Sequence, residues 1–280
     1  MSDIITERVA DSPSELAQVL SQFTPHGLHD LKRAQLMNRV DTKFVVPKAD
    51  LPALLADLQQ AFTILEIDGR RLFQYESTYF DTPEFEFYHQ HHRGSLNRYK
   101  VRFREYRDTQ TRYLEVKFKN NKKRTEKNRI LISNFEIFDI NNYTDYLQDL
   151  GVPTCSNLVP KLVNRYERIA LASEVRAERL TIDINLENSP AASEGSLALG
   201  PLAILELKQA KLNRNSIAYQ ALRDLQLRPR SFSKYCMGLA LTGSSSLKTN
   251  RFRKHIRYIQ QSLSEAVSYT HLRAHETTSH

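Results

Sequence analysis

Two neighbouring stretches decide the fold of this chain: Lys100-Val-Arg-Phe-Arg104 and Leu114-Glu-Val-Lys-Phe-Lys119. In both, charged side chains alternate with apolar ones, a period of two that is typical of β-strands with one polar and one apolar face. Every charged position except Glu115 carries Lys or Arg. The two stretches therefore predict adjacent strands that share one strongly cationic face.

The same alternation extends to four further stretches, residues 39–44, 164–168, 181–186 and 205–208. For a single strand, the solvated side of an antiparallel sheet explains such a pattern well. Taken together, the strands favour another arrangement, because Arg and Lys dominate positions that Thr, Gln and Ser usually fill on a solvated face. A few carboxylates, among them Asp41 and Glu206, sit at equivalent places.

Amphipathic helices are predicted between the strands. Apolar residues recur at helical spacing after the capping box Ser12-Pro-Ser-Glu15 and after Asp50, and again over 141–150 and 216–227, with a short helix after Ser231. Such helices need an apolar sheet face to cover, so the fold class is α+β. If they cover the outside, the charged faces point at one another across a closed or cupped antiparallel sheet, which makes a cationic tunnel.

The amino-acid composition and net charge limit the classes of function that the chain can have. The 280 residues carry 40 Lys+Arg against 32 Asp+Glu, a net charge of +8, with 40% hydrophobic residues. This is enough apolar material for a globular core, and the charge excess, concentrated between Arg93 and Arg129, suggests a polyanionic partner. Two cysteines without a CxxC motif indicate no disulfide framework, and no signal peptide or membrane span is visible, so we expect a cytoplasmic protein.

A cationic interior implies a ligand of high negative charge, because like charges inside a barrel repel one another and lose hydration. Phosphate chains match Arg forks well, and the scattered carboxylates would then serve as hard oxygen ligands for Mg²⁺ or Mn²⁺. No phosphate-loop, GxGxxG, GxSxG or HExxH motif occurs. His89, His91 and His92 fall in what reads as a Gln/Arg-rich turn without spaced ligand partners, which argues against a metal role for them.

Eight motifs in register give the sequence a family resemblance over residues 36–240. They are Arg39-Val-Asp-Thr-Lys43-Phe, Tyr79-Phe-Asp-Thr82, Asn97 to Tyr106, Leu114-Glu-Val-Lys117, Glu126-Lys127, Arg165-Tyr-Glu-Arg168, Ile204-Leu-Glu-Leu-Lys208 and Phe232-Ser-Lys-Tyr235. The sequence resembles VTC domains, the polyphosphate polymerase domains of the vacuolar transporter chaperone complex and their bacterial stand-alone relatives. These belong to the triphosphate tunnel metalloenzyme (CYTH-like) superfamily. The resemblance implies a closed antiparallel β-tunnel of about eight strands with a cationic interior and helices packed outside.

The resemblance implies roles for particular residues. Expected catalytic residues are Arg102, Arg104, Lys117, Arg168 and Lys208. Expected substrate-binding residues are Lys43, Lys100, Lys127, Tyr166, Ser233 and Lys234. Glu206 is the expected principal metal ligand, and the charged-face argument adds Glu115 and Asp183 as weaker candidates. Asp41 stands where the superfamily often has the second Glu of a Glu-x-Glu-x-Lys signature, which leaves no metal role assigned to the first strand.

The function expected from this resemblance is a metal-dependent polyphosphate polymerase that transfers the γ-phosphate of ATP to a polyphosphate chain. A triphosphatase on the same fold and a non-catalytic polyphosphate or nucleic-acid binder remain alternatives. ATP and polyphosphate are the expected partners, and no specific nucleic acid is expected. Sensing or translocation would need partner subunits, such as a membrane protein, which would place the chain at the inner face of a membrane.

The expected domain organisation follows the same motifs. Residues 1–38 form an N-terminal helical segment, 39–240 the VTC-like tunnel domain and 241–265 a basic C-terminal helix, which is either solvated or laid on an acidic or membrane surface. Residues 266–280 read as a non-native or disordered tail.

Overall fold

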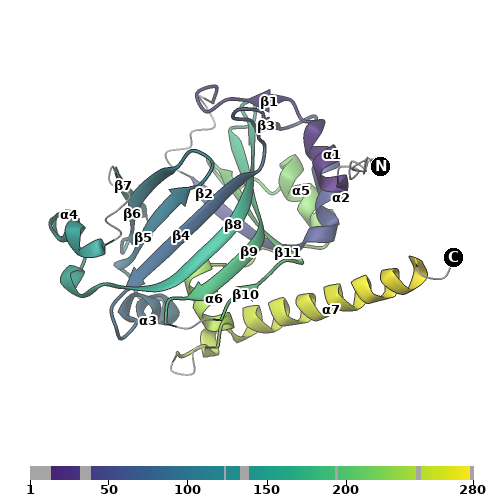
Figure 1. Cartoon of the computed structure of the whole chain (residues 1–280). Helices are drawn as coiled ribbons and strands as arrows, with labels where there is room; N and C mark the ends of the chain where they lie inside the picture. The colour runs from purple at the N-terminus through teal and green to yellow at the C-terminus, as the bar shows by residue number, and fades with distance from the viewer. Residues whose placement is uncertain are drawn as a thin grey trace, which may run out of the picture.

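The fold is built around one large, mostly antiparallel sheet (Figure 1). The computed structural model describes residues 14–31, 39–122, 124–132, 139–192, 195–243 and 247–277, with side chains up to residue 265 in the last stretch. The long strands are β2 (Val40–Pro47), β4 (Phe73–Asp81), β5 (Arg98–Tyr106), β6 (Thr111–Lys119), β7 (Thr125–Leu131), β8 (Val159–Ser173), β9 (Glu178–Pro190) and β11 (Leu202–Gln209). Short strands are β1 (Pro25–His26), β3 (Thr63–Leu65) and β10 (Leu197–Ala198).

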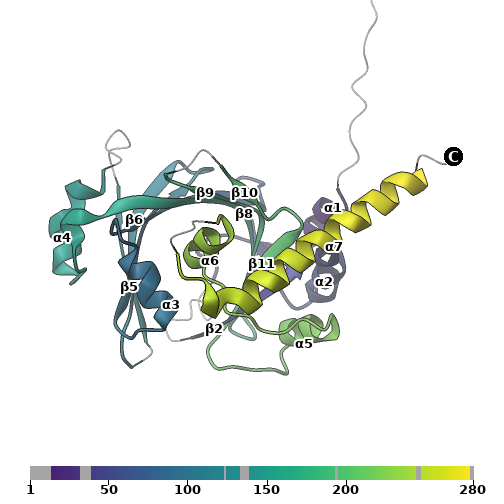
Figure 2. The ribbon, with the colours of Figure 1, turned by 90° about the horizontal axis from the view of Figure 1, so that it is seen from below.

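The long strands follow one another in the order β2, β11, β9, β8, β4, β5, β6 and β7, each antiparallel to its neighbour. Seen along the strands, the sheet curls round on itself (Figure 2). Within the described residues no pairing joins β7 to β2, so the predicted tunnel is a curled sheet rather than a hydrogen-bonded ring. Residues 32–38 and 133–138, next to these two edges, lie outside the described part of the chain.

The predicted alternation of side chains is confirmed by the strand register. Arg102 pairs with Glu115 on β6 and with Tyr79 on β4, while Lys43 on β2 pairs with Glu206 on β11. Because all residues of one parity point to one face, these pairs place charged side chains in cross-strand rows on the inner face of the sheet.

Helices cover the outer face, as the sequence predicts. Helices α1 (Glu15–Ser21), α2 (Leu51–Leu58, preceded by the turn η2, Lys48–Asp50) and α5 (Ile217–Asp224) pack on the apolar side of β2, β11, β9 and β8. The turn η3 (Ile140–Tyr143) and helix α4 (Thr144–Asp149) cover β5 and β6, followed by the turn η4 (Cys155–Asn157). Burial of these apolar surfaces, at about 25 cal/mol per Å², drives formation of the sheet-and-helix layers.

Local signals fix where several helices begin and end. Ser14 caps α1 through Ala17 N at 3.3 Å, so the N-cap lies two residues after the Ser12 that begins the predicted box. Ser216 caps α5 in the same way, and Gly151, with a φ of 69°, follows the end of α4.

Helix α6 (Lys234–Leu241) differs from the others because it packs on the inner side of the sheet, at one end (Figure 2). It contacts Tyr79 on β4 and Leu162 on β8, and the N-cap of the helix is Ser233. Tyr235 of α6 donates a hydrogen bond to the buried carboxylate of Asp81 at 2.5 Å. The apolar end of the inner face is thus closed by α6, while the charged part of that face lies beside the N-terminus of this helix.

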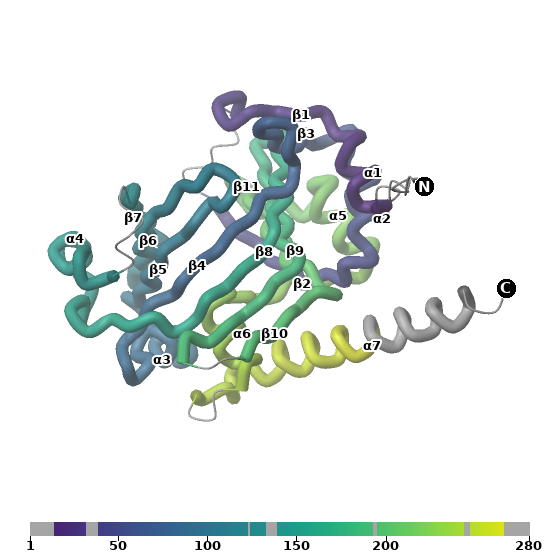
Figure 3. Tube along the Cα trace, in the orientation of Figure 1, coloured from purple at the N-terminus to yellow at the C-terminus, as the bar shows by residue number. Residues whose placement is uncertain are grey.

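Two helices pack next to α6. Helix α3 (Glu86–Arg93) carries the three neighbouring histidines, so the expectation of a turn there is wrong. After the turn η5 (Asn250–Phe252), helix α7 (Arg253–Thr277) begins beside α6 and packs against β2, with Ile259 buried in the same apolar cluster as Val45 and Met237 (Figure 3). Among the described residues, no helix is both long and apolar enough to cross a membrane.

Gly238 allows the close approach of α6 to the sheet. A Cβ atom at this position would lie 2.6 Å from Leu162 Cδ2 and 2.7 Å from Asn188 Oδ1, which is too close for either atom to stay in place. A small residue is therefore required where α6 crosses β8 and β9.

We expect Gly238→Ala to lower the free energy of unfolding by about 1–3 kcal/mol, because overpacking outweighs the helix propensity that Ala adds. Urea unfolding of the full chain measures this. Gly195→Ala is the matched control, since no atom lies within 4 Å of a Cβ there. Equal stability of the two variants would contradict the packing described for α6.

Candidate functional site on the inner face

Nine of the predicted basic side chains gather on the inner face or at its border with α6, against four carboxylates. The basic residues are Lys43, Lys100, Arg102, Arg104, Lys117, Lys127, Arg168, Lys208 and Lys234. Three of the carboxylates, Glu115, Asp183 and Glu206, each lie in contact with at least two of these cations. The fourth is Asp41, which pairs in register with Lys208. The structure thus brings all the predicted charged site residues to one region.

Glu115 on β6 holds together the first cluster. Its Oε2 lies 2.5 Å from Arg102 Nη2 and 3.8 Å from Arg104 Nη1, and its Oε1 lies 2.7 Å from Lys127 Nζ. Burial opposes ionisation of this carboxyl, yet the three surrounding cations outweigh burial and lower its pKa. Tyr79 OH accepts a further hydrogen bond from Arg102 Nη1 at 2.9 Å, so Arg102 is held from two strands.

Asp183 on β9 holds together the second cluster. Arg168 on β8 forms a two-pronged pair with it, with Nε–Oδ1 at 2.6 Å and Nη2–Oδ2 at 2.8 Å. Lys234, the first residue of α6, also binds Oδ2. The pKa of Asp183 is lowered because these cations outweigh its complete burial. This cluster ties α6 to the sheet at the charged part of the inner face.

Glu206 on β11 is the most accessible of the three carboxylates that contact at least two of these cations. Its oxygens lie 3.3 Å from Lys43 Nζ and 3.0 Å from Lys208 Nζ, and 20% of its side chain is exposed, against 2% for Glu115 and 3% for Asp183. Burial opposes ionisation, but Lys208 and Lys43 keep its pKa well below the usual range. Glu206 is therefore a charged carboxylate that a ligand can still reach.

Lys100 and Lys117 form a pair of neighbouring cations without a carboxylate partner among the described residues. Lys100 Nζ donates to Ser233 Oγ at 2.8 Å, and Ser233 Oγ also accepts from Cys236 N at the start of α6. Burial lowers the pKa of both lysines to about 8, and repulsion from Lys43 adds to this effect at both; Lys117 is also repelled by Lys100, and Lys100 by Arg98 and Arg102. Holding both charges here costs free energy that a bound anion would recover.

Tyrosine rings pack against the cations of these clusters. Tyr75 and Tyr166 stack with their ring centroids 5.3 Å apart, and the guanidinium carbon of Arg168 lies 5.1 Å and 5.3 Å from these two centroids. Tyr166 OH accepts from Arg104 Nη2 at 3.1 Å, and Lys234 Nζ lies 4.6 Å from the Tyr166 ring. Tyr166 is only 3% exposed, so it positions these cations, and its hydroxyl is already hydrogen-bonded.

The carboxylates fit a divalent cation only together with a ligand. Within the described residues, no group of three His, Cys, Asp or Glu side chains could hold a metal ion. Mg²⁺ is usually bound by one or two carboxylates that share it with substrate phosphates and water. Accessible Glu206 suits that arrangement, whereas Glu115 and Asp183 are buried in their ion pairs.

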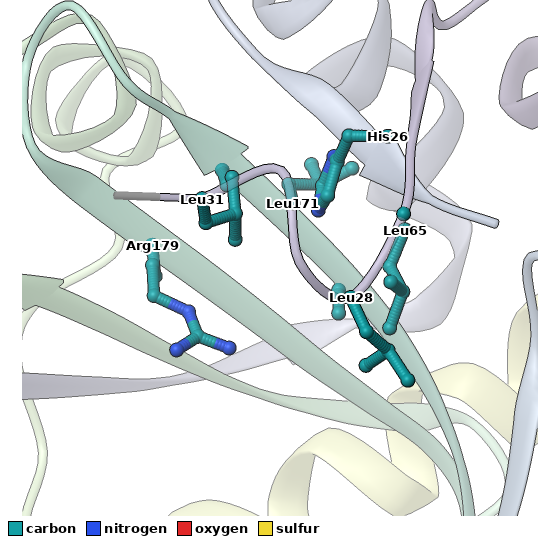
Figure 4. A pocket seen from close by; sticks show the side chains of 9 residues that line it. His26, Leu28, Leu31, Leu65, Leu171 and Arg179 are labelled. Atoms are coloured by element: carbon teal, nitrogen blue, oxygen red, sulfur yellow. The ribbon is translucent and has the colours of Figure 1, made fainter. Parts of the chain in front are cut away.

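Besides Arg129, which pairs in register with Glu115, sequence reasoning missed three basic residues of the same face. Arg98 and Lys119 face each other across β5 and β6, one step beyond Lys100 and Lys117. Arg179 pairs in register with Lys208 and lines a cavity of about 90 Å³ beneath the leucines of the loop after β1 (Figure 4). The two-residue period of their strands was the signal that could have identified all three.

Comparison with solved structures finds chains of low identity. A Bacillus halodurans protein is 16% identical (TM-score 0.47) and matches over 70% of this chain and 93% of its own. HpAC1 from Hippeastrum, described as having a dominant triphosphatase activity, is 15% identical (TM-score 0.46), with 72% and 96% covered. PH1819 from Pyrococcus horikoshii is 14% identical (TM-score 0.41), with 72% and 99% covered.

No curated protein sequence matches the chain significantly. The model of the VTC domain family matches residues 38–242. This span contains the curled sheet from β2 onward, the three ion-pair clusters and helix α6. The chain therefore belongs to the VTC domain family.

Proposed function

We propose that the chain is a metal-dependent polyphosphate polymerase, which transfers the γ-phosphate of ATP to a polyphosphate chain on the inner face. The observation that carries this proposal is the imbalance of nine cations against four carboxylates, with Lys100 and Lys117 left next to each other. A polyanion is the ligand that such a surface fits, and phosphate oxygens accept hydrogen bonds from both Lys and Arg.

The residues present can supply most of the chemistry of phosphoryl transfer. This reaction needs positioning and neutralisation of charge more than a covalent nucleophile. Arg102 and Arg168 are oriented by carboxylates and by tyrosines before any ligand arrives, so their donors are preorganised. Arg104, Lys117 and Lys208 would add charge stabilisation to the transferred group, while Lys43, Lys100, Lys127 and Lys234 would bind the remaining phosphates.

A bound Mg²⁺ or Mn²⁺ would be held by Glu206 together with phosphate oxygens, and it would polarise the phosphoryl group. Lys43 and Lys208 keep Glu206 ionised, which a hard cation requires. Ser233 and Lys100 form a hydrogen bond at the N-terminus of α6, which would orient Lys100 toward a phosphate next to this helix.

The first prediction concerns the reaction itself. Incubated with ATP and Mn²⁺, the full chain should form polyphosphate and a matching amount of ADP, and a chelator should stop both. Chromatographic separation of ADP, orthophosphate and polyphosphate measures this. Orthophosphate as the sole phosphate product would identify a triphosphatase instead, and binding without turnover would identify a receptor or a chain that needs a partner.

The second prediction tests charge stabilisation by Arg102. Arg102→Ala should lower kcat on the order of a hundredfold, which corresponds to about 3 kcal/mol of transition-state stabilisation. Arg165→Ala is the matched control, because Arg165 also pairs with a glutamate, Glu76 at 2.7 Å, but lies on the opposite face of β8. Turnover of Arg102→Ala near that of the control would remove Arg102 from the mechanism.

The third prediction concerns pH. Lys100 must be protonated to attract a phosphate, and its pKa of about 8 in the free protein means that it loses this proton as pH rises. The affinity for tripolyphosphate should therefore fall as pH rises from about 7 to about 9. Lys100→Arg, which stays charged, should reduce the slope. A wild-type affinity that is constant over this range, measured by calorimetry, would contradict the role of Lys100.

A further inference from the structure

The cationic rows of the inner face continue beyond the residues that the sequence identified. On β5 and β6, Arg98 and Lys119 pair in register two residues away from Lys100 and Lys117, a distance of about 7 Å along the strands. Tyr99 and Phe118 between them stack on the other side of the sheet, with ring centroids 4.6 Å apart. Arg98 and Lys119 therefore point to the same face as Lys100.

Helix α3 places a histidine against this row. The helix packs against β5. Burial, followed by the charges of Lys100, Arg98 and Lys119, lowers the pKa of His91 to about 2, so the imidazole is neutral. Its Nδ1 atom is buried and has no hydrogen-bond partner in the described part of the chain. A buried polar atom without a partner is costly, and a ligand oxygen could accept from a proton on Nδ1.

The chemistry of this place is that of a second anion site. Within the described residues, no carboxylate lies within 4 Å of Arg98, and the one hydrogen bond of its side chain, from Nη1 to Ser95 O at 2.7 Å, uses one of five donors. Burial lowers the pKa of Arg98, as expected for a cation held without an opposite charge.

We propose that Arg98, Lys119 and His91 form an additional phosphate-binding subsite at the α3 end of the inner face, which takes the phosphates of a chain longer than a triphosphate. The subsite rests on the proposed function, since Lys100 and Lys117 must hold the adjoining phosphates of the same chain. It distinguishes substrates by length: a triphosphate is held by the rows around Arg102 and Lys100, and a polyphosphate also reaches Arg98 and Lys119.

The test compares two probes, tripolyphosphate and long-chain polyphosphate, by calorimetry at one ionic strength, because phosphate binding depends strongly on salt. The variant Arg98→Gln/Lys119→Gln removes two charges from the subsite. Lys122→Gln/Arg124→Gln, in the exposed turn that follows Lys119, removes the same charge outside it and serves as the control. Melting temperatures show that each variant is folded.

We expect the subsite variant to lower the affinity for long-chain polyphosphate by at least about tenfold and the affinity for tripolyphosphate by less than about threefold. The control variant should change neither affinity. His91→Leu should lower the affinity for long-chain polyphosphate alone. His91→Asn, which keeps a hydrogen-bond donor, should retain part of the affinity that His91→Leu loses. If the subsite variant loses affinity for both probes equally, or for neither, the proposed subsite is wrong. If the double variant does not fold, Lys119→Gln alone decides between the same outcomes.

The same experiment separates the subsite from the proposed function. Failure of the wild-type chain to bind tripolyphosphate would contradict the inner face as a phosphate site. Tight binding of tripolyphosphate without any selective effect of Arg98 and Lys119 would contradict the subsite alone.

Discussion

The repulsion among like charges on the inner face is the constraint on which the rest of the structure depends. Four carboxylates offset part of it, and three of them are surrounded by cations: Arg102, Arg104 and Lys127 for Glu115, Arg168 and Lys234 for Asp183, Lys43 and Lys208 for Glu206. Stacked tyrosines support the guanidinium groups. The helices on the outer face bury apolar surface, and the free energy gained from this burial offsets the remaining repulsion among the cations.

Helix α6 connects the core to the site. Its N-terminus presents Ser233 and Lys234 to the charged region, while Tyr235 is fixed by Asp81 and by stacking on Tyr79 at 5.3 Å. Tyr79 in turn binds Arg102. A change in the packing of α6 would therefore move Ser233, Lys234 and, through Tyr79, Arg102. The glycine at position 238 allows this packing and so helps to fix the geometry of the charged region.

The sequence could predict much of this arrangement, because alternation along a strand determines which side chains share a face. It correctly placed Lys43, Arg102, Lys117 and Glu206 together. Helix α3 was missed because its N-terminus carries no N-cap signal in the adjacent sequence. Its first N–H groups are capped instead by Asp81, at the end of β4, which accepts hydrogen bonds from Phe87 N at 2.8 Å and Tyr88 N at 2.9 Å.

The partners of the carboxylates could not be predicted either, since alternation gives the face of a residue but not the strand beside it. Glu115 and Asp183 were predicted as metal ligands, and the structure shows both within buried ion pairs.

The most direct test of the account is a crystal structure of the full chain with tripolyphosphate. The account predicts an anion on the inner face, in contact with Lys100, Lys117 and Arg102; an anion bound elsewhere, with this face unchanged, would contradict it.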